Sequence, residues 1–162
     1  TREIAMPVRK LKEYLDRENV KYVSIRHSPA YTSQEIAASA HIRGQELAKT
    51  VVVKVDGKMA LAVLPASVKV DLGLLREATN ARRTELATES DFINAFPECE
   101  LGAMPPFGNL YEMPVYVDER LALDVEIAFN AGTHSELIRM PYAEFVRLAA
   151  PRVVRLSAGV PA

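Results

Sequence analysis

Three separated segments contain residue types that can bind and position a small ligand. Lys49 and Thr50 open a β-branched apolar run, residues 102–108 read Gly-Ala-Met-Pro-Pro-Phe-Gly, and residues 130–134 read Asn-Ala-Gly-Thr-His. A lysine held by a strand offers a compact cation to a phosphate or a ribose oxygen. Adjacent prolines stiffen the second segment, while its glycines let a ligand approach the backbone closely. We therefore expect the three segments to line one pocket.

The second and third segments supply groups that suit acyl chemistry. The backbone N–H groups of Gly102, Ala103 and Gly108 can stabilise a carbonyl oxygen or position water. His134, beside a Gly-Thr turn, can bond to ribose, water or an acyl carbonyl. Each segment also has an ordinary structural alternative: a solvated strand end for Lys49, a rigid connector for residues 102–108, and a surface residue for His134.

Several common chemistries have no motif in this chain. There is no phosphate-binding glycine loop, no dinucleotide fingerprint, no His-Glu-x-x-His and no Gly-x-Ser-x-Gly. His27, His41 and His134 lie far apart without ligand spacing, so no metal site is predicted. The single Cys99 forms no internal disulfide, which fits a reducing cytoplasm, and its acidic neighbours disfavour a thiolate.

Composition indicates one globular domain over residues 1–162. Apolar residues are 49% of the chain and charged residues 25%. No apolar run approaches about 18 residues, and no secretory leader opens the chain, so a cytoplasmic protein without a membrane span is expected. The formal net charge is −1 with scattered basic residues, which limits any nucleic-acid contact to a small, transient one.

One hairpin is predicted with particular clarity. Residues 50–55 and 58–64 are apolar runs separated by Asp56-Gly57, which is a strong signal for a two-residue hairpin turn. Both runs are apolar on both faces, so the hairpin should be central in a covered sheet.

A second strand pair is predicted near the C-terminus. Leu123, Val125, Ile127 and Phe129 alternate with polar or small residues, which is the pattern of a half-buried strand. A turn at 130–133 should lead to a returning strand at 136–140. Short strands are also expected at 22–25 and 152–156.

Helices are predicted by apolar spacing and by capping residues. They are expected around Val8, Leu11 and Leu15; after the capping box Thr32–Glu35; after Asp71, with Leu72 and Leu75; after Thr88, with Phe92, Ile93 and Phe96 inward; and around Tyr142, Phe145, Val146 and Ala149. Hairpins dominate over long crossovers. The fold class is therefore α+β, with a mixed, largely antiparallel central sheet and surrounding helices.

The functional segments, in this order, resemble the YbaK/proline-tRNA-synthetase editing-domain family. The resemblance covers the chain from about Val8 to Leu156. It rests on these segments: His27-Ser28-Pro29-Ala30-Tyr31-Thr32 with Glu35, Ala48-Lys49-Thr50-Val51-Val52, Leu64-Pro65-Ala66, the loop from Gly102 to Gly108, and Asn130-Ala131-Gly132-Thr133-His134.

The resemblance implies a YbaK-like fold and a free-standing deacylase that acts in trans on mischarged tRNA. It implies that Lys49 contacts the tRNA 3′ end, that Gly102 belongs to the catalytic loop, and that His134 lies near the aminoacyl group. These three are the expected catalytic residues. The expected substrate-binding residues are His27, Thr32, Thr50, Ala103, Met104, Phe107, Gly108, Asn130, Gly132 and Thr133.

The resemblance further implies an aminoacylated tRNA as partner, bound by its 3′ end, and leaves a transient association with an aminoacyl-tRNA synthetase open. No metal or organic cofactor is expected, because a positioned water assisted by the ribose hydroxyl can cleave the activated ester. A small amino acid is expected as cargo, alanine first and serine or threonine next. Two other classes stay open: a non-catalytic module that binds a tRNA end or nucleotide, and a hydrolase of a small acylated metabolite.

Overall fold

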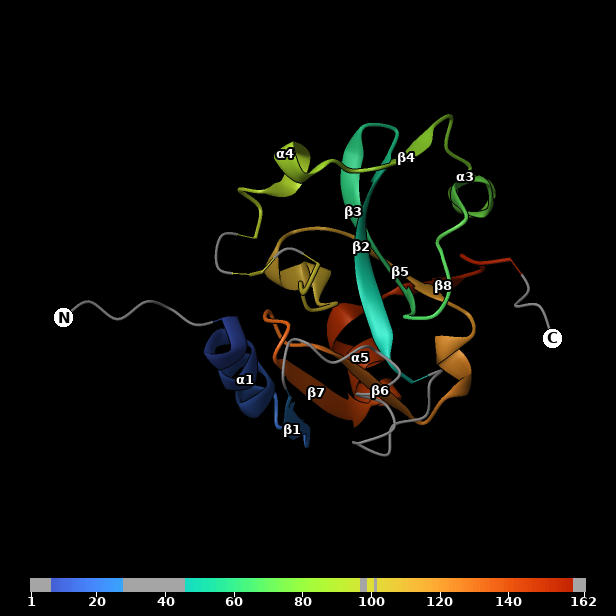
Figure 1. The fold of residues 1–162 in the computed structure, drawn as a ribbon. Helices are drawn as coiled ribbons and strands as arrows, with labels where there is room; N and C mark the ends of the chain where they lie inside the picture. Colours follow the sequence, from blue (N-terminus) through green and yellow to red (C-terminus); the bar gives the residue numbers. More distant parts are fainter. Residues whose placement is uncertain (1–6, 28–45, 97–98, 101, 159–162) are drawn as a thin grey trace.

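The computed structural model describes residues 7–27, 46–96, 99–100 and 102–158. Its strands form two sheets, one of five strands in the order β4-β2-β3-β5-β8 and one of three in the order β1-β7-β6 (Figure 1). The predicted α+β class, with a mostly antiparallel arrangement, is confirmed. Within the described residues, no helix has the length and apolar character needed to cross a membrane.

The predicted hairpin is confirmed and is central in the larger sheet. β2 (Ala48–Val55) runs antiparallel to β3 (Lys58–Pro65), with Lys49 opposite Leu64. Asp56 and Gly57 both have positive φ, 49° and 83°, as a tight two-residue hairpin turn requires. Each strand of the hairpin also pairs with one further strand, so neither lies at an edge of the sheet.

The remaining strands of the larger sheet extend it on both sides. β4 (Thr84–Leu86) pairs antiparallel with β2, whereas β5 (Val115–Asp118) runs parallel to β3, and β8 (Arg152–Val154) runs parallel to β5. Helix α3 (Leu72–Thr79) buries Leu75, and Asp71 caps it as predicted by accepting a hydrogen bond from the Leu74 N–H at 3.0 Å. This side of the sheet has its own apolar cluster, which includes Val53 and Leu156.

The smaller sheet carries the C-terminal strand pair. β6 (Glu126–Asn130) and β7 (Glu136–Pro141) are antiparallel, and β1 (Val23–Arg26) adds to β7. Helices α1 (Pro7–Arg17) and α5 (Tyr142–Ala149) complete this half of the molecule (Figure 1). The main core combines residues from both halves, among them Leu11, Leu15, Val52, Leu61, Phe129, Ile138 and Phe145.

The two sheets meet where β2 begins. Leu47 forms a parallel bridge with Ala128, and the Ala128 N–H donates to the Glu46 carbonyl at 2.9 Å. The start of the hairpin is therefore fixed against β6, which places the end of β6 near the first residues of β2.

The prediction of a half-buried strand over 123–129 is wrong in its first part. Leu123 and Val125 are 83% and 82% exposed, because the chain makes a short 3-10 turn, η2 (Leu121–Leu123), before β6 begins. From residue 127 onward the alternation fails for another reason. Ile127, Ala128 and Phe129 are all buried, since Leu47 and Leu137 cover the Ala128 face.

Two residues that were predicted to face inward from helices are exposed instead. Helix α4 (Glu89–Phe92) has the predicted capping box between Thr88 and Asp91, but it ends just before Ile93, which is 51% exposed. In α5, Val146 is 38% exposed, whereas the other predicted apolar positions are buried. The helix predicted after Thr32 and the side chain of Val8 lie outside the described residues.

Candidate functional site

Backbone hydrogen bonds join the Gly102 loop to the turn between β6 and β7. The Gly132 N–H donates to the Ala103 carbonyl at 2.9 Å, and the Glu100 N–H donates to the Gly132 carbonyl at 2.9 Å. Within the loop, the Ala103 N–H donates to the Glu100 carbonyl at 3.0 Å. Two segments about 30 residues apart in the sequence are thus held in contact by reciprocal bonds.

This contact places the imidazole of His134 beside Gly102. A Cβ built on Gly102 would lie 3.5 Å from Cε1 of His134 and 3.7 Å from its Nε2. Both residues are exposed, and Gly102 has a φ of 81°, which favours glycine. The structure therefore brings together two of the three residues expected to be catalytic.

The candidate backbone donors differ in availability. The Ala103 N–H is already bonded to Glu100, and Gly108 is fully buried. No hydrogen bond is recorded for the Gly102 N–H within the part of the chain that the structure describes, and this residue is exposed. Gly102 is thus the best-placed of the three to donate to a ligand oxygen.

Lys49 and Thr50 project to opposite faces of β2, because side chains alternate along a strand. Thr50 shares its face with Ala48 and Val52, which belong to the core between the two sheets. Lys49 shares its face with Val53, which belongs to the cluster on the α3 side. Lys49 and Thr50 line one surface only if the lysine reaches around the strand, because their side chains leave β2 on opposite faces. Among the described residues, Lys49 is not one of the near neighbours of Gly102.

Close to Lys49, the chain is joined to β6 by the isolated parallel bridge between Leu47 and Ala128. Lys49 comes two residues after the first of these, and Asn130 comes two residues after the second. Burial, and then the positive charge of nearby Lys69, lower the pKa of the Lys49 ammonium from its ordinary value. A half-buried cation next to a second cation is an arrangement suited to an anion.

Thr50 is unusual in a different way. Its side chain is buried, with 6% of the residue exposed, and its Oγ1 has no hydrogen-bond partner among the described residues. A buried hydroxyl without a protein partner costs stability, and a polar group of a ligand can supply the missing hydrogen bond.

A polar groove lies between α1 and the β1–β7 pair. It has a volume of about 670 Å³. The Thr133 and Ser135 hydroxyl oxygens lie 3.3 Å apart on its wall, and the His27 N–H donates to the Ser135 carbonyl at 2.9 Å. Thr133 and Ser135 thus face the groove, whereas the side chain of His134 between them lies beside Gly102. The groove residues are Arg9, Lys12, Glu13, Asp16, Arg26, His27, Thr133, Ser135 and Glu136.

Glu136 fixes the base of this groove. Its buried carboxylate pairs with Lys12 at 2.6 Å, accepts a hydrogen bond from the Ser24 hydroxyl, and lies 3.7 Å from Arg26. Burial alone would raise the pKa of this carboxyl group. The hydrogen bonds from Lys12 and Ser24 and the two positive charges outweigh burial, so the pKa of Glu136 lies below its ordinary value. The network ties α1 and β1 to the strand that follows the His134 turn.

The remaining loop residues lie behind the site. Phe107 is fully buried and packs edge-on against Tyr14, Phe129 and Phe145, with ring centroids 5.6–5.9 Å apart. A Cβ on Gly108 would lie 2.3 Å from the Met113 carbonyl oxygen, so only glycine fits. Ala103 and Met104 are buried as well. Substrate contact by these four residues remains a prediction; their position fixes the back of the loop.

Two residues near the site escaped the sequence reasoning. Glu100 accepts a hydrogen bond from the His134 N–H at 2.6 Å, yet in the sequence it is only an acid beside Cys99. Lys69 affects Lys49 although 20 positions separate them. No spacing rule links either pair, because both contacts depend on how loops fold back. Thr32 lies outside the described residues.

The groups assembled here suit ester hydrolysis without a protein nucleophile. The backbone of the exposed Gly102 can hold a carbonyl oxygen, and the imidazole of His134 lies beside it. Among the described residues, no three His, Cys, Asp or Glu side chains gather closely enough to hold a metal ion.

Comparison with known proteins defines the class of protein. The family model described as "Aminoacyl-tRNA editing domain" matches residues 27–148. The chain belongs to this family.

The chain is also similar to individual members with known names or structures. The "Multifunctional Ser/Thr-tRNA deacylase ProXp-y" of Escherichia coli (strain K12) is 33% identical over 126 residues, which cover 72% of this chain and 74% of that protein. Among solved structures, a candidate trans-editing enzyme for prolyl tRNA synthetase has a TM-score of 0.82 at 21% identity, covering 97% of this chain and all of that one. The hypothetical protein APE2540 has a TM-score of 0.80 at 19% identity, covering 92% and 99%. These structural matches establish the shared fold.

Proposed function

We propose that this protein is a trans-acting aminoacyl-tRNA deacylase. It hydrolyses the ester that joins a wrong amino acid to the terminal adenosine of a tRNA. Family membership supports this activity, and one observation carries it within the structure: the exposed Gly102 backbone and the His134 imidazole are held side by side by bonds between two loops.

The reaction needs a water molecule, a hydrogen-bond donor for the oxyanion and a proton acceptor. Water adds to the ester carbonyl, and the Gly102 N–H stabilises the negative charge that develops on its oxygen. The C–O bond to the ribose then breaks, and the ribose oxygen leaves with a proton. The neighbouring ribose hydroxyl relays the proton from water, while His134 positions water or the acyl group by a hydrogen bond.

The tRNA end is bound by groups around this centre. Lys49, with the positive charge of Lys69 nearby, provides positive charge for a phosphate of the 3′ end, and Asn130 ends the strand that bridges to Leu47 through Ala128. His27 and Thr133 contact the RNA from the groove, as Thr32 does in the family-based expectation. The tRNA is bound briefly, in trans, after a synthetase has charged it.

We propose serine or threonine as the preferred cargo, with alanine next. The E. coli relative carries Ser/Thr in its name. In this chain, the buried Thr50 hydroxyl has no hydrogen-bond partner among the described residues and lies on the core face of β2. A hydroxylated side chain would satisfy Thr50, whereas alanine would leave it unpaired, and such differences give strong discrimination.

The test is deacylation of a panel of mischarged tRNAs carrying serine, threonine or alanine, in wild type and Thr50→Val. Turnover by the wild type excludes a module that only binds RNA. Valine has nearly the same shape as threonine but lacks the hydroxyl. Thr50→Val should therefore lower the ratio of Ser/Thr turnover to Ala turnover, while the free energy of unfolding stays the same or increases. Binding of every charged tRNA without turnover would overturn the proposed function. An unchanged ratio would overturn the role of Thr50 alone.

A further inference from the structure

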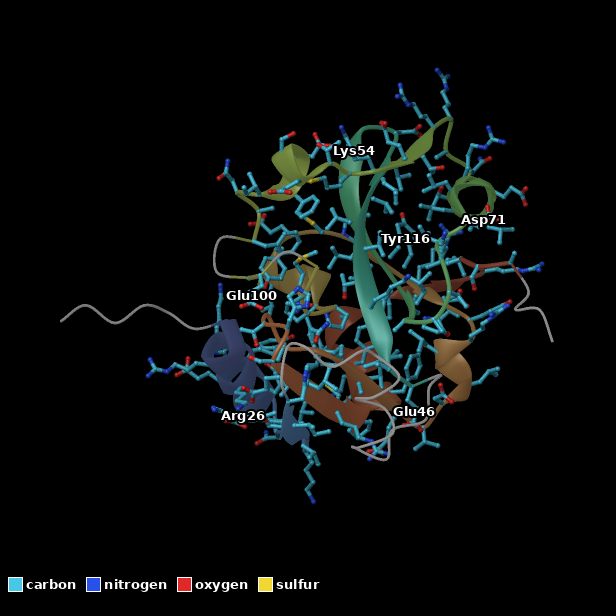
Figure 2. All side chains as sticks on the ribbon, viewed as in Figure 1. Arg26, Glu46, Lys54, Asp71, Glu100 and Tyr116 are labelled. Carbon is cyan, nitrogen blue, oxygen red and sulfur yellow. The ribbon has the colours of Figure 1, made fainter. Side chains whose placement is uncertain are left out.

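Glu100 lies at the junction of the two loops that form the centre of the site. Figure 2 labels its side chain, on the segment between α4 and the 3-10 helix η1 (Gly108–Leu110). Three of its groups make three different bonds. The N–H donates to Gly132, the carbonyl accepts from Ala103, and the carboxylate accepts from the N–H of His134.

The carboxylate bond differs from the others in what it fixes. The backbone bonds hold the Gly102 loop against Gly132, two residues before the histidine. The carboxylate Oε1 lies 2.6 Å from the His134 nitrogen and thus fixes the residue that carries the imidazole. Charge-assisted hydrogen bonds of this length are the stronger kind, even on an exposed residue.

We propose that Glu100 is a positioning residue for deacylation, which acts by holding the His134 backbone so that the imidazole stays beside Gly102. The inference rests on the proposed function. Without the carboxylate, the backbone bonds still join the loops, so the fold survives. The His134 backbone is then less restrained, and its ring spends less time beside the reacting ester. The chemical step should slow, while tRNA binding, which depends on other residues, should not change.

The test compares Glu100→Ala with Glu100→Gln. Glu100→Ala should lower kcat about tenfold, because small misplacements of reacting groups are costly, and should leave KM within about twofold. Glu100→Gln keeps an oxygen that can accept the same bond, so it should retain most of kcat. The NMR signal of the His134 amide proton should move upfield in Glu100→Ala and much less in Glu100→Gln.

Asp91 offers a matched control. Its carboxylate Oδ2 accepts a hydrogen bond from the Thr88 N–H at 2.7 Å in the capping box of α4, outside the site. Asp91→Ala removes the same kind of bond and should leave kcat unchanged. A second control combines Glu100→Ala with His134→Ala. If Glu100 acts through His134, replacing Glu100 should have no further effect on kcat once the histidine has been replaced.

The outcomes separate this proposal from the proposed function. The inference is overturned if Glu100→Ala keeps wild-type kcat, if Glu100→Gln is as impaired as Glu100→Ala, or if Glu100→Ala has its full effect in the His134→Ala background. A wild-type protein that hydrolyses no mischarged tRNA overturns the proposed function itself, and the positioning role with it.

Discussion

Two turns of this molecule connect antiparallel strands and have opposite character. The β2–β3 turn contains only Asp56 and Gly57, and the Oδ1 of Asp56 accepts hydrogen bonds from the backbone N–H groups of Arg82 and Arg83, both at 2.9 Å. The β6–β7 turn spans residues 131–135 and is held from outside by Glu100. In the β2–β3 turn, the carboxylate that accepts the backbone hydrogen bonds belongs to the turn itself. In the β6–β7 turn, it belongs to a neighbouring loop.

This difference separates a structural turn from a functional one. The side chain of the short turn accepts hydrogen bonds from the neighbouring backbone of Arg82 and Arg83. In the longer turn, Thr133 and Ser135 line the groove while His134 lies beside Gly102. A turn that is braced by another segment can offer its side chains to a ligand.

The sharpest test of this contrast uses the glycines of the two regions. Gly102 and Gly57 have nearly the same φ, 81° and 83°, so valine at either position meets similar backbone strain, about 1–3 kcal/mol. Gly102→Val also places a branched side chain against His134 and should lower kcat/KM by about a hundredfold. Gly57→Val has nothing within 4 Å of its Cβ and should affect only stability. Thermal unfolding and deacylation rates measured together check both. Equal loss of activity in the two variants would contradict the contrast.

A smaller loss of activity is expected when Lys49 on β2 is replaced. Lys49→Ala should reduce deacylation at subsaturating tRNA at least tenfold, about 1.4 kcal/mol, with little change in the unfolding temperature. Lys54→Ala, near the other end of the same strand, removes a lysine that pairs with Asp91 at 3.5 Å and serves as the control. Full activity of Lys49→Ala would remove this residue from the site.

The lowered pKa of Lys49 adds a pH test. Because the folded-state pKa lies below the ordinary value of about 10.4, the ammonium loses its charge at lower pH than an exposed lysine. KM should therefore rise with pH earlier in wild type than in Lys49→Arg, which stays charged. Stability changes in the opposite direction, because folding disfavours the protonated group. This cost is fully present below the folded-state pKa and decreases as pH rises from the folded-state pKa to the higher unfolded-state value. Identical KM profiles in the two proteins would argue against a phosphate contact.

A partial loss is expected for His134→Ala. A positioning hydrogen bond should contribute less than the roughly 10²–10⁴-fold of a general base, and the pH–rate profile of the wild type should lack the inflection that a general base would produce. Hydrolysis should be abolished for a tRNA without the free vicinal hydroxyl. If that tRNA is hydrolysed normally, His134→Ala is inactive and the inflection is present, then the histidine is the base.

No loss of activity is expected at the short turn. Asp56→Ala removes two hydrogen bonds and places alanine at a φ of 49°, so it should lower the free energy of unfolding by about 1–2 kcal/mol. Asp56→Asn keeps an acceptor and tolerates this φ, so it should recover most of the stability. Reduced kcat in either variant would show that the two turns are coupled.

Sequence patterns predicted the local features of the fold. The Asp56-Gly57 turn and the caps at Asp71 and Thr88 follow from residues within a few positions, and all three are confirmed. Burial of Ala128 could not be predicted, because its cover, Leu47, comes from a distant part of the chain. Alternation therefore failed where a segment from outside the three-stranded sheet meets β6.

The site was predictable to a similar degree. Residue types and order indicated the Gly102 loop and the His134 turn, which the structure brings together. The brace from Glu100 and the influence of Lys69 on Lys49 had no signal, because an exposed acid and a loop lysine look like ordinary surface residues. Contacts of side chains with distant backbone carry no periodicity that a sequence could display.

The pairing of β1 with β7 has a consequence for how the chain folds during synthesis. α1 and β1 leave the ribosome before the other described elements, but the partner strand of β1 follows much later, since Ser24 and Glu136 are 112 positions apart. The β2–β3 hairpin is local and can form in between, because short loops close at little entropic cost. We therefore expect the N-terminal segment to wait unpaired while the larger sheet is assembled, and to join the smaller sheet among the last steps. Pulse-labelling hydrogen exchange during refolding should protect the amides of β1 after those of β2 and β3.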